Sequence, residues 1–368
     1  MLIGIDGSRA VKFPRTGTEK YSFELIKAFT KLVTKHQFVI YLSKDPLVEN
    51  NLAGNEKIFW RDLPSNFKIK VIERRRLWTL IGLSNEMRNK PPEVLFVPAH
   101  VLPVFLPPKS VVTLHGTEYR ECPASYRFRE RLYLNYTTRR SLKKASKIIC
   151  VSETAKKNFL KYYPRTDANK IVVIRHGVNT ESLDKISGRY QLPFSEPYLL
   201  FIGTQVPRKN LRYLIEEFQY LAKDFKLVIA GKKTTHTDKL KELGRKLKIE
   251  KDVYWLDYLG ESEKWQLLKS AKALIEPSKA AGFGMTIYEA MAVKTPVCLA
   301  ENDLFREVGK DAAYYFDTEK PGDLASRINE METNQKRLQE KIDQGFTLAQ
   351  NASWHKVALS TLDSIIRC

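Results

Sequence analysis

Cysteines and long apolar runs are scarce in this chain. Its 368 residues include four cysteines, Cys122, Cys150, Cys298 and Cys368, and no two of them form a CxxC pair. No histidine lies near any of them at the spacing of metal ligands, so we expect free thiols in a reducing compartment and no structural zinc site. No segment approaches the roughly 20 apolar residues that a membrane-spanning helix needs.

The first residues lack the marks of a signal peptide. Residues 1–7 carry no basic segment, and their apolar run has only the length of a strand. We therefore expect cytoplasmic residence, with a peripheral position at the inner face of the cell membrane as a further candidate. The chain also has no Asp-x-Asp pair, the pattern that would suggest a metal site.

Acidic residues are outnumbered by basic ones. The chain has 62 Lys and Arg against 42 Asp and Glu, which gives a net charge of +20 and a pI near 9.6. This balance favours anionic partners such as a membrane surface, nucleic acid or a phosphorylated substrate. The alternative is a solvated basic face without a partner. No recognisable nucleic-acid-binding module is present, so we do not expect nucleic acid as a partner.

Short, β-branched apolar runs alternate with amphipathic helical stretches almost throughout. The predicted strands cover residues 2–5, 38–42, 68–71, 94–97, 111–114, 147–151, 171–174, 198–202, 226–230, 253–256, 273–275 and 297–299, and helices such as 18–35 and 126–144 lie between several of them. This order is typical of parallel sheets covered by helices on both faces. The sequence predicts an α/β protein with two doubly wound, Rossmann-like domains.

A polar segment divides the two strand–helix series. Residues 188–197 contain Pro193 and Pro197, which discourage regular structure, so we interpret the segment as an interdomain linker. The predicted domains are an N-terminal domain of residues 1–190 and a C-terminal domain of residues 198–350. Residues 351–368 form a final amphipathic helix.

A glycine-bearing turn follows the apolar run of residues 273–275. Gly282 and Gly284 lie just before a helix that is expected to start near Thr286, so backbone N–H groups and the helix dipole would face a phosphate. Glu289 lies one turn into that helix, where it could accept hydrogen bonds from ribose hydroxyls. The predicted nucleotide-binding residues here are Gly282, Phe283, Gly284, Met285, Thr286 and Glu289.

The segment from residue 277 to residue 292 resembles the donor-site signature of retaining glycosyltransferases of family 4. That signature reads Pro-Ser-x-x-Glu-Gly-Phe-Gly, four further residues, then Glu-Ala-Met-Ala. The resemblance implies the GT-B fold, in which two domains face across a cleft and a C-terminal helix crosses back onto the first domain. It also implies ribose binding by Glu289. This chain departs from the signature at Ala281, where the family has a glutamate that touches the donor sugar.

Three other segments are similar to motifs of the same family. Gly17 lies in a glycine loop before a helix that would approach the diphosphate, and His115 follows a buried strand where the family has a histidine that reaches the donor sugar. In residues 201–211, the family's diphosphate-binding lysine falls on Lys209 after the strand-ending Gly203. Arg208 would supply a second cation, since Thr204 replaces an arginine of the family. We predict catalytic roles for His115, Arg208 and Lys209.

The resemblance implies metal-independent, retaining transfer of a sugar from a nucleotide-sugar donor to a glycan or lipid-linked acceptor, as in polysaccharide biosynthesis. The wording of residues 203–210 looks like the mannosyltransferase branch, so GDP-mannose is the expected donor. No cofactor is expected, because the nucleotide-sugar is a substrate. The alternative is a catalytically impaired GT-B protein that binds nucleotides or acts as a scaffold. Gly116, Thr204 and Ala281, which replace family residues, motivate it.

Two basic, aromatic stretches complete the pattern. Residues 73–83 join three arginines to Trp78, and residues 126–147 carry cations together with Tyr126, Phe128, Tyr133 and Tyr136. Such surfaces suit anionic lipid headgroups, which makes an anionic membrane surface a candidate partner. The alternative is a solvated face over a core helix.

Overall fold

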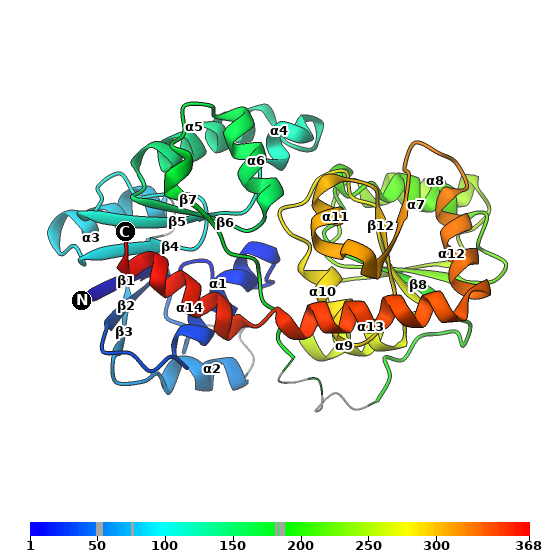
Figure 1. Ribbon diagram of the computed structural model, residues 1–368, viewed down its shortest axis with the longest axis horizontal. Coiled ribbons are helices and arrows are strands. Elements are labelled where there is room, and N and C mark those ends of the chain that lie inside the picture. Colours follow the sequence, from blue (N-terminus) through cyan, green and yellow to red (C-terminus); the bar gives the residue numbers. More distant parts are fainter. Residues whose placement is uncertain (49–53, 75–76, 181–182, 184–187) are drawn as a thin grey trace. The chain divides into compact units, whose positions relative to one another are not determined.

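The computed structural model describes residues 1–48, 54–74, 77–180, 183 and 188–368. The chain divides into two compact units. Figure 1 colours the ribbon by position in the sequence. Unit 1 consists of Met1–Thr117, Arg127–Gly177 and Trp354–Cys368, and unit 2 consists of Glu118–Tyr126 and Val178–Ser353. The segment 188–197, predicted as a linker between domains, belongs to unit 2, since this unit begins its main part at Val178.

Unit 1 is built on a seven-stranded sheet with the order β3-β2-β1-β4-β5-β6-β7, in which all neighbouring strands are parallel. The strands are β1 (Leu2–Asp6), β2 (Gln37–Leu42), β3 (Phe67–Val71), β4 (Val94–Val97), β5 (Lys109–Leu114), β6 (Lys147–Cys150) and β7 (Ile171–Val173). Each predicted strand of this half is present, with ends that differ by at most two residues. The apolar residues of the inner strands β4, β5 and β6 are buried, as expected for a sheet covered on both faces, whereas the edge strands β3 and β7 are partly exposed.

Unit 1 also contains helical segments. They are α1 (Gly17–Phe29), α2 (Gly54–Arg61), the π-helix η1 (Trp78–Leu83), α3 (Ser84–Asn89), α5 (Phe128–Lys144), α6 (Glu153–Tyr162), the short η3 (Ala168–Lys170) and α14 (Trp354–Ile366). Helix α14 packs against α1, β5 and β6 of unit 1. The helix predicted for residues 18–35 ends earlier, at Phe29, because the backbone turns at Thr30, whose hydroxyl donates to the Lys27 carbonyl.

Unit 2 contains a six-stranded parallel sheet with the order β10-β9-β8-β11-β12-β13. Its strands are β8 (Tyr198–Ile202), β9 (Lys226–Ala230), β10 (Val253–Leu256), β11 (Ala273–Glu276), β12 (Val297–Ala300) and β13 (Ala313–Phe316). The edge strand β13 was not expected. It is a short aromatic run without the valines and isoleucines that marked most of the other strands.

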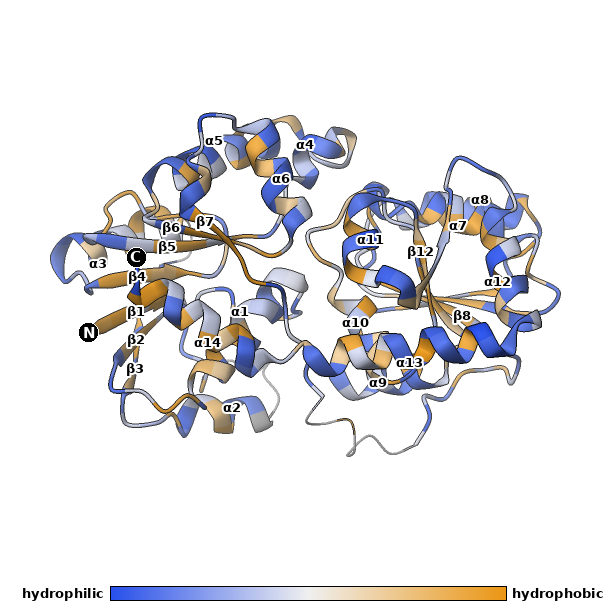
Figure 2. Ribbon diagram, in the orientation of Figure 1, coloured by the Kyte–Doolittle hydropathy of each residue, from blue (hydrophilic) through white to orange (hydrophobic). Residues whose placement is uncertain are grey.

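Unit 2 also contains helical segments. They are α4 (Glu118–Glu121), η2 (Pro123–Ser125), η5 (Pro207–Lys209), α7 (Leu211–Phe218), α8 (Thr237–Lys246), α9 (Glu261–Ser270), α10 (Met285–Ala292), α11 (Asp303–Gly309), η6 (Lys310–Ala312), α12 (Asp323–Thr333) and α13 (Gln335–Asn351). Figure 2 shows apolar strands at the centre of each unit and mixed or polar outer helices. The fold is the predicted pair of Rossmann-like domains.

Candidate functional site

The sheet of unit 2 reverses its strand order between β8 and β11. From β8 the chain proceeds outward to β9 and β10, and from β11 it proceeds the other way to β12 and β13. In open α/β sheets, ligands bind beyond the carboxyl ends of the strands at such a switch point. Gly203 follows β8, and the glycine turn of residues 277–284 follows β11. The structure therefore brings the two predicted donor-site motifs together at the expected place in the sheet.

Helix α10 begins directly after this turn. Gly284 has a φ of 95°, and a side-chain Cβ at this position would lie 2.8 Å from Ile287 Cδ1. The positive φ favours glycine, because L side chains rarely adopt it, whereas the Ile287 methyl group could shift. Phe283 is buried, and its ring stacks on that of Tyr288 at 5.4 Å between centroids. The first turn of α10, which includes Met285 and Thr286, is thus held in place at the end of β11.

Lys209 forms a buried ion pair with Glu276. Its Nζ lies 2.9 Å from Glu276 Oε2, and the two side chains are 13% and 5% exposed. The Ser278 hydroxyl donates to the other carboxylate oxygen. A Cβ on Gly203 would lie 3.5 Å from Lys209 Cε and 3.0 Å from the Phe201 ring. A side chain at position 203 would therefore press against the Phe201 ring, while its contact with Lys209 would be an ordinary van der Waals contact.

Arg208 connects the two motifs. Its Nη1 donates to the Ala280 carbonyl at 3.2 Å, while the Lys279 N–H donates to the Arg208 carbonyl at 3.0 Å. These two hydrogen bonds join η5 to the turn that precedes α10. The guanidinium thus orders the loop next to Ala281 in this structure.

Glu289 is buried on α10 and pairs with a lysine of α9. Lys264 Nζ lies 2.8 Å from Glu289 Oε1 and 3.0 Å from Glu261 Oε2. A ribose that hydrogen-bonds to Glu289 would therefore lie close to a cation. Sequence reasoning missed Lys264, which is one lysine among many. It also missed Glu276, whose signal was present: a charged residue ends the otherwise apolar strand Ala273–Glu276.

The turns after β8 and β9 pack closely and are joined by a hydrogen bond. Gly231 has a φ of 126°, and a Cβ there would lie 2.4 Å from the Gly203 carbonyl oxygen. The buried Gln205 donates to the Gly231 carbonyl at 3.2 Å and accepts from the Thr237 hydroxyl at 2.7 Å. Hydrogen bonds thus join the loop after β8 to the loops after β9 and β11.

His115 and Gly17 belong to unit 1, whereas the other predicted site residues belong to unit 2. His115 follows β5, and its Nε2 lies 2.8 Å from the Pro98 carbonyl oxygen. Gly17 is exposed at the start of α1. One turn further along α1, the Tyr21 ring meets the His115 ring edge-on at 4.7 Å.

Aromatic rings and two more histidines surround His115. Its ring centroid lies 5.1 Å from that of His100 and 5.6 Å from that of His176, and Tyr21 contacts both His176 and Trp354. Burial lowers the pKa of His100 to about 4 and lowers the pKa of His176 well below its ordinary value. Both imidazoles are therefore neutral near pH 7. His100 was not singled out from the sequence, because it lies in a loop without a motif.

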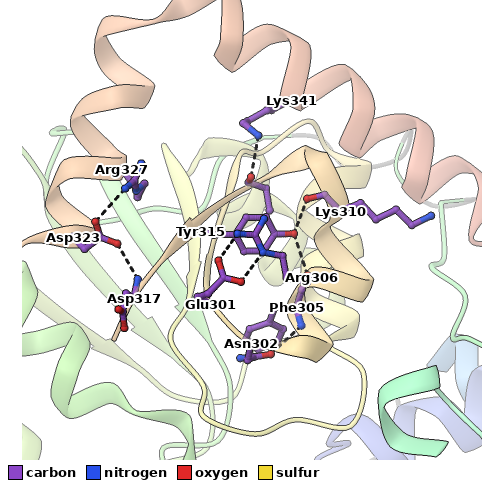
Figure 3. A network of polar contacts seen from close by, with 11 residues as sticks. Glu301, Asn302, Phe305, Arg306, Lys310, Tyr315, Asp317, Asp323, Arg327 and Lys341 are labelled. Atoms are coloured by element: carbon purple, nitrogen blue, oxygen red, sulfur yellow. Dashed lines mark hydrogen bonds and ion pairs between the residues drawn. The ribbon is translucent and has the colours of Figure 1, made fainter. Parts of the chain in front are cut away.

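A polar cavity of about 390 Å³ lies elsewhere in unit 2, beside the edge strand β13 (Figure 3). Arg327 pairs with Asp323 at 3.2 Å, Arg306 pairs with Glu301, and Lys341 donates to the carbonyls of Asp311 and Ala313 at 2.7 and 3.0 Å. This network covers the free edge of the sheet. None of the predicted site residues lines the cavity.

Across the described ranges, no group of three or more His, Cys, Asp or Glu residues could hold a metal ion. Within the same part of the chain, no helix is long and apolar enough to cross a membrane.

Comparison with known proteins gives two family matches. Residues 15–182 match the model Glycosyltransferase Family 4, and residues 184–346 match the model Glycosyl transferases group 1. The O-antigen chain mannosyltransferase B of Escherichia coli is 24% identical over an alignment of 385 residues that covers 98% of each chain. The O-antigen chain mannosyltransferase RfbU of Salmonella typhimurium is 28% identical over 255 residues, 69% of each chain.

Solved structures agree with the fold. WaaG, a glycosyltransferase involved in lipopolysaccharide biosynthesis, superposes with a TM-score of 0.71 at 15% identity and 99% coverage of both chains. Anabaena HepE in complex with UDP-glucose gives a TM-score of 0.72 at 16% identity, with 100% of this chain and 99% of that chain covered. The two family matches, the paired parallel sheets and the donor-site motifs at the switch point show that this chain belongs to the family 4 glycosyltransferases of GT-B fold.

Proposed function

We propose that the protein transfers a hexosyl residue, with retention and without a metal ion, from a nucleotide-sugar to a glycan or lipid-linked acceptor. GDP-mannose is the proposed donor, because two of the relatives with long alignments are O-antigen mannosyltransferases. The observation that carries the proposal is the arrangement of Lys209 and the start of α10 at the switch point of unit 2.

The chemistry follows from charge that develops on the leaving group. As the bond between the sugar and the diphosphate breaks, negative charge grows on the phosphate oxygens. Lys209 and the N–H groups at the start of α10 would stabilise this charge, which is an electrostatic task. Glu289 would hold the ribose, and His115 would orient the donor sugar. Arg208 would act on the diphosphate only if it exchanged the Ala280 carbonyl for a phosphate oxygen.

A donor screen tests this proposal. The purified protein is heated with GDP-mannose, UDP-glucose and related nucleotide-sugars, because a ligand of the folded state raises the melting temperature. The best stabiliser is then offered with lipid-linked and free glycan acceptors, with and without a chelator, and NMR reports the anomeric configuration of the product. We expect stabilisation by GDP-mannose and a retained configuration in both conditions. Inversion, or loss of transfer with the chelator, would contradict the proposed mechanism.

The second candidate is a nucleotide-binding protein without transfer activity. Ala281 motivates it, because a methyl side chain cannot hydrogen-bond the sugar hydroxyls that the family's glutamate touches. The same screen separates the candidates. Stabilisation by nucleotides without transfer or donor hydrolysis would favour the binding protein.

Helix α5 supports a peripheral membrane position. Its exposed apolar side chains are Phe128, Leu132, Tyr133 and Tyr136, with exposed fractions from 44% to 70%, and its exposed cations include Arg129, Arg139, Lys143 and Lys144. Aromatic anchors among cations suit an anionic lipid surface. The other predicted stretch contributes less, because Trp78 is buried and donates to the Ile72 carbonyl at 2.8 Å, while Arg75 and Arg76 lie outside the described residues.

Vesicle cosedimentation tests the membrane position. Vesicles with anionic lipid should bind more protein than neutral ones, and binding should fall as salt rises. Replacing Arg139, Lys143 and Lys144 by glutamine should abolish the preference. Binding that ignores lipid charge would contradict this position.

A further inference from the structure

Glu276 is a buried carboxylate at the centre of the proposed donor site. It ends the apolar strand β11 and is 4% exposed. A buried charge is costly unless it is paired and hydrogen-bonded, and both of its oxygens have partners. Oε2 accepts from Lys209 Nζ at 2.9 Å, and Oε1 accepts from the Ser278 hydroxyl. The carboxylate is therefore fixed against the cation that the diphosphate would use.

This pairing affects the affinity for a diphosphate in two opposite ways. Glu276 holds the Lys209 ammonium in one place, so little side-chain freedom remains to be lost when a phosphate binds. Glu276 also opposes the phosphate, because its negative charge lies 2.9 Å from the cation that the diphosphate would use. Because water screens this buried pair poorly, the Glu276 carboxylate cancels much of the attraction between Lys209 and the phosphate.

We propose that Glu276 is a positioning residue that holds Lys209 for the diphosphate and, by its charge, limits the affinity for the nucleoside diphosphate product so that it can leave. This inference rests on the proposed function. It assigns a role to a carboxylate that the donor-site signature does not contain. It also explains why a charged residue ends a strand whose other residues are buried and apolar.

A second ion pair in the same sheet provides a matched control. Lys226 Nζ lies 2.6 Å from Asp252 Oδ1, where Lys226 starts β9 and Asp252 immediately precedes β10. This pair lies at the amino ends of the strands, whereas Glu276 lies at a carboxyl end. Asp252→Asn thus removes a paired carboxylate of the same domain without touching the proposed site.

The test compares Glu276→Gln with the parent by calorimetry, with GDP and guanosine as probes. The amide keeps the shape, and its oxygen can still accept from Lys209 while its NH2 group can donate to the Ser278 oxygen, so the main change is the loss of the charge. We expect GDP to bind at least tenfold more tightly, which corresponds to about 1.4 kcal/mol, with guanosine affinity unchanged. The product-inhibition constant for GDP should fall by the same factor, and kcat should fall because release is slower. Asp252→Asn should bind GDP like the parent.

Unchanged or weaker GDP binding by Glu276→Gln would overturn the inference, as would tighter binding of guanosine to the same degree. Glu276→Asp keeps the charge but withdraws it from Lys209, so it should show a smaller gain in GDP affinity. If Glu276→Gln does not fold, the absence of that gain in Glu276→Asp overturns the inference instead. A parent protein that binds neither GDP nor UDP would overturn the proposed function and, with it, this inference.

Discussion

Replacing Lys209 by methionine should lower both the unfolding free energy and the affinity for a nucleoside diphosphate, and the two effects can be measured separately. Methionine keeps the length of the side chain beside Gly203 and Phe201 but removes the ammonium. Glu276, 5% exposed at its side chain, then remains buried without its cation. Removing one partner of a buried ion pair typically costs about 3–5 kcal/mol of unfolding free energy. Loss of the phosphate contact should weaken nucleoside diphosphate binding by about 1.5–3 kcal/mol, the scale of a charge-assisted hydrogen bond.

A double variant separates the two effects. Lys209→Met with Glu276→Gln removes the stranded charge while leaving an acceptor in place, so most of the lost stability should return. Relative to Glu276→Gln alone, the double variant should still show the loss of diphosphate affinity. Urea unfolding measures the first quantity, and calorimetry with GDP and guanosine measures the second. If the single variant is as stable as the parent, the pair does not contribute as described. If the double variant binds GDP as tightly as Glu276→Gln alone, Lys209 is not a phosphate ligand.

Three further predictions concern other residues of the two units. Glu289→Gln should weaken GDP and guanosine binding by about 1.5–3 kcal/mol while the protein stays folded, because Lys264 keeps its ion pair with Glu261; equal affinities in calorimetry would argue against ribose binding. Ala281→Glu should lower the rate of sugar transfer in an initial-rate assay, because the retained Lys209, Glu289 and His115 suggest a functional pocket built around alanine. A large gain in rate would show instead that the parent is impaired. As pH falls from 6.5 to about 4, the unfolding free energy should fall, because His100 binds a proton in the unfolded chain but not when it is buried in the folded protein. His100→Asn, which tolerates the φ of 54° at this position, should make the dependence of unfolding free energy on pH shallower in urea titrations. An unchanged dependence would contradict the lowered pKa of His100.

Much of the fold could be predicted because its signals are local. Apolar runs such as Val94–Val97 and Lys226–Ala230 reveal a strand by composition alone, and both have the predicted bounds. The strand β13 could not be found in the same way, because its Ala-Tyr-Tyr-Phe sequence is short and lacks aliphatic β-branched residues. Its place at the sheet edge comes from pairing with β12, which is a tertiary contact.

The sequence predicted the motifs of the candidate site but not the ion pairs between its residues. The glycines and Lys209 stand in recognisable phrases, so their meeting at the switch point could be anticipated. Pairing of Lys209 with Glu276, and of Glu289 with Lys264, depends on side chains that are 67 and 25 residues apart in the sequence. Arg208 was expected to serve the phosphate, whereas in the structure it donates to the Ala280 carbonyl. No local pattern reveals which of several cations meets which carboxylate.

The order in which the ribosome makes this chain differs from the order in which its units become complete. Unit 2 has all its residues once Ser353 has been synthesised, whereas unit 1, which contains the first residue, still lacks Trp354–Cys368. Trp354 contacts Tyr21 and stacks on His176, and a Cβ at Gly177 would lie 2.5 Å from the Trp354 backbone nitrogen. A nascent chain therefore carries an open aromatic cluster beside His115 until α14 emerges. A protein truncated after Ser353 would keep every predicted site residue but would lack Trp354, which contacts Tyr21 and His176 beside His115.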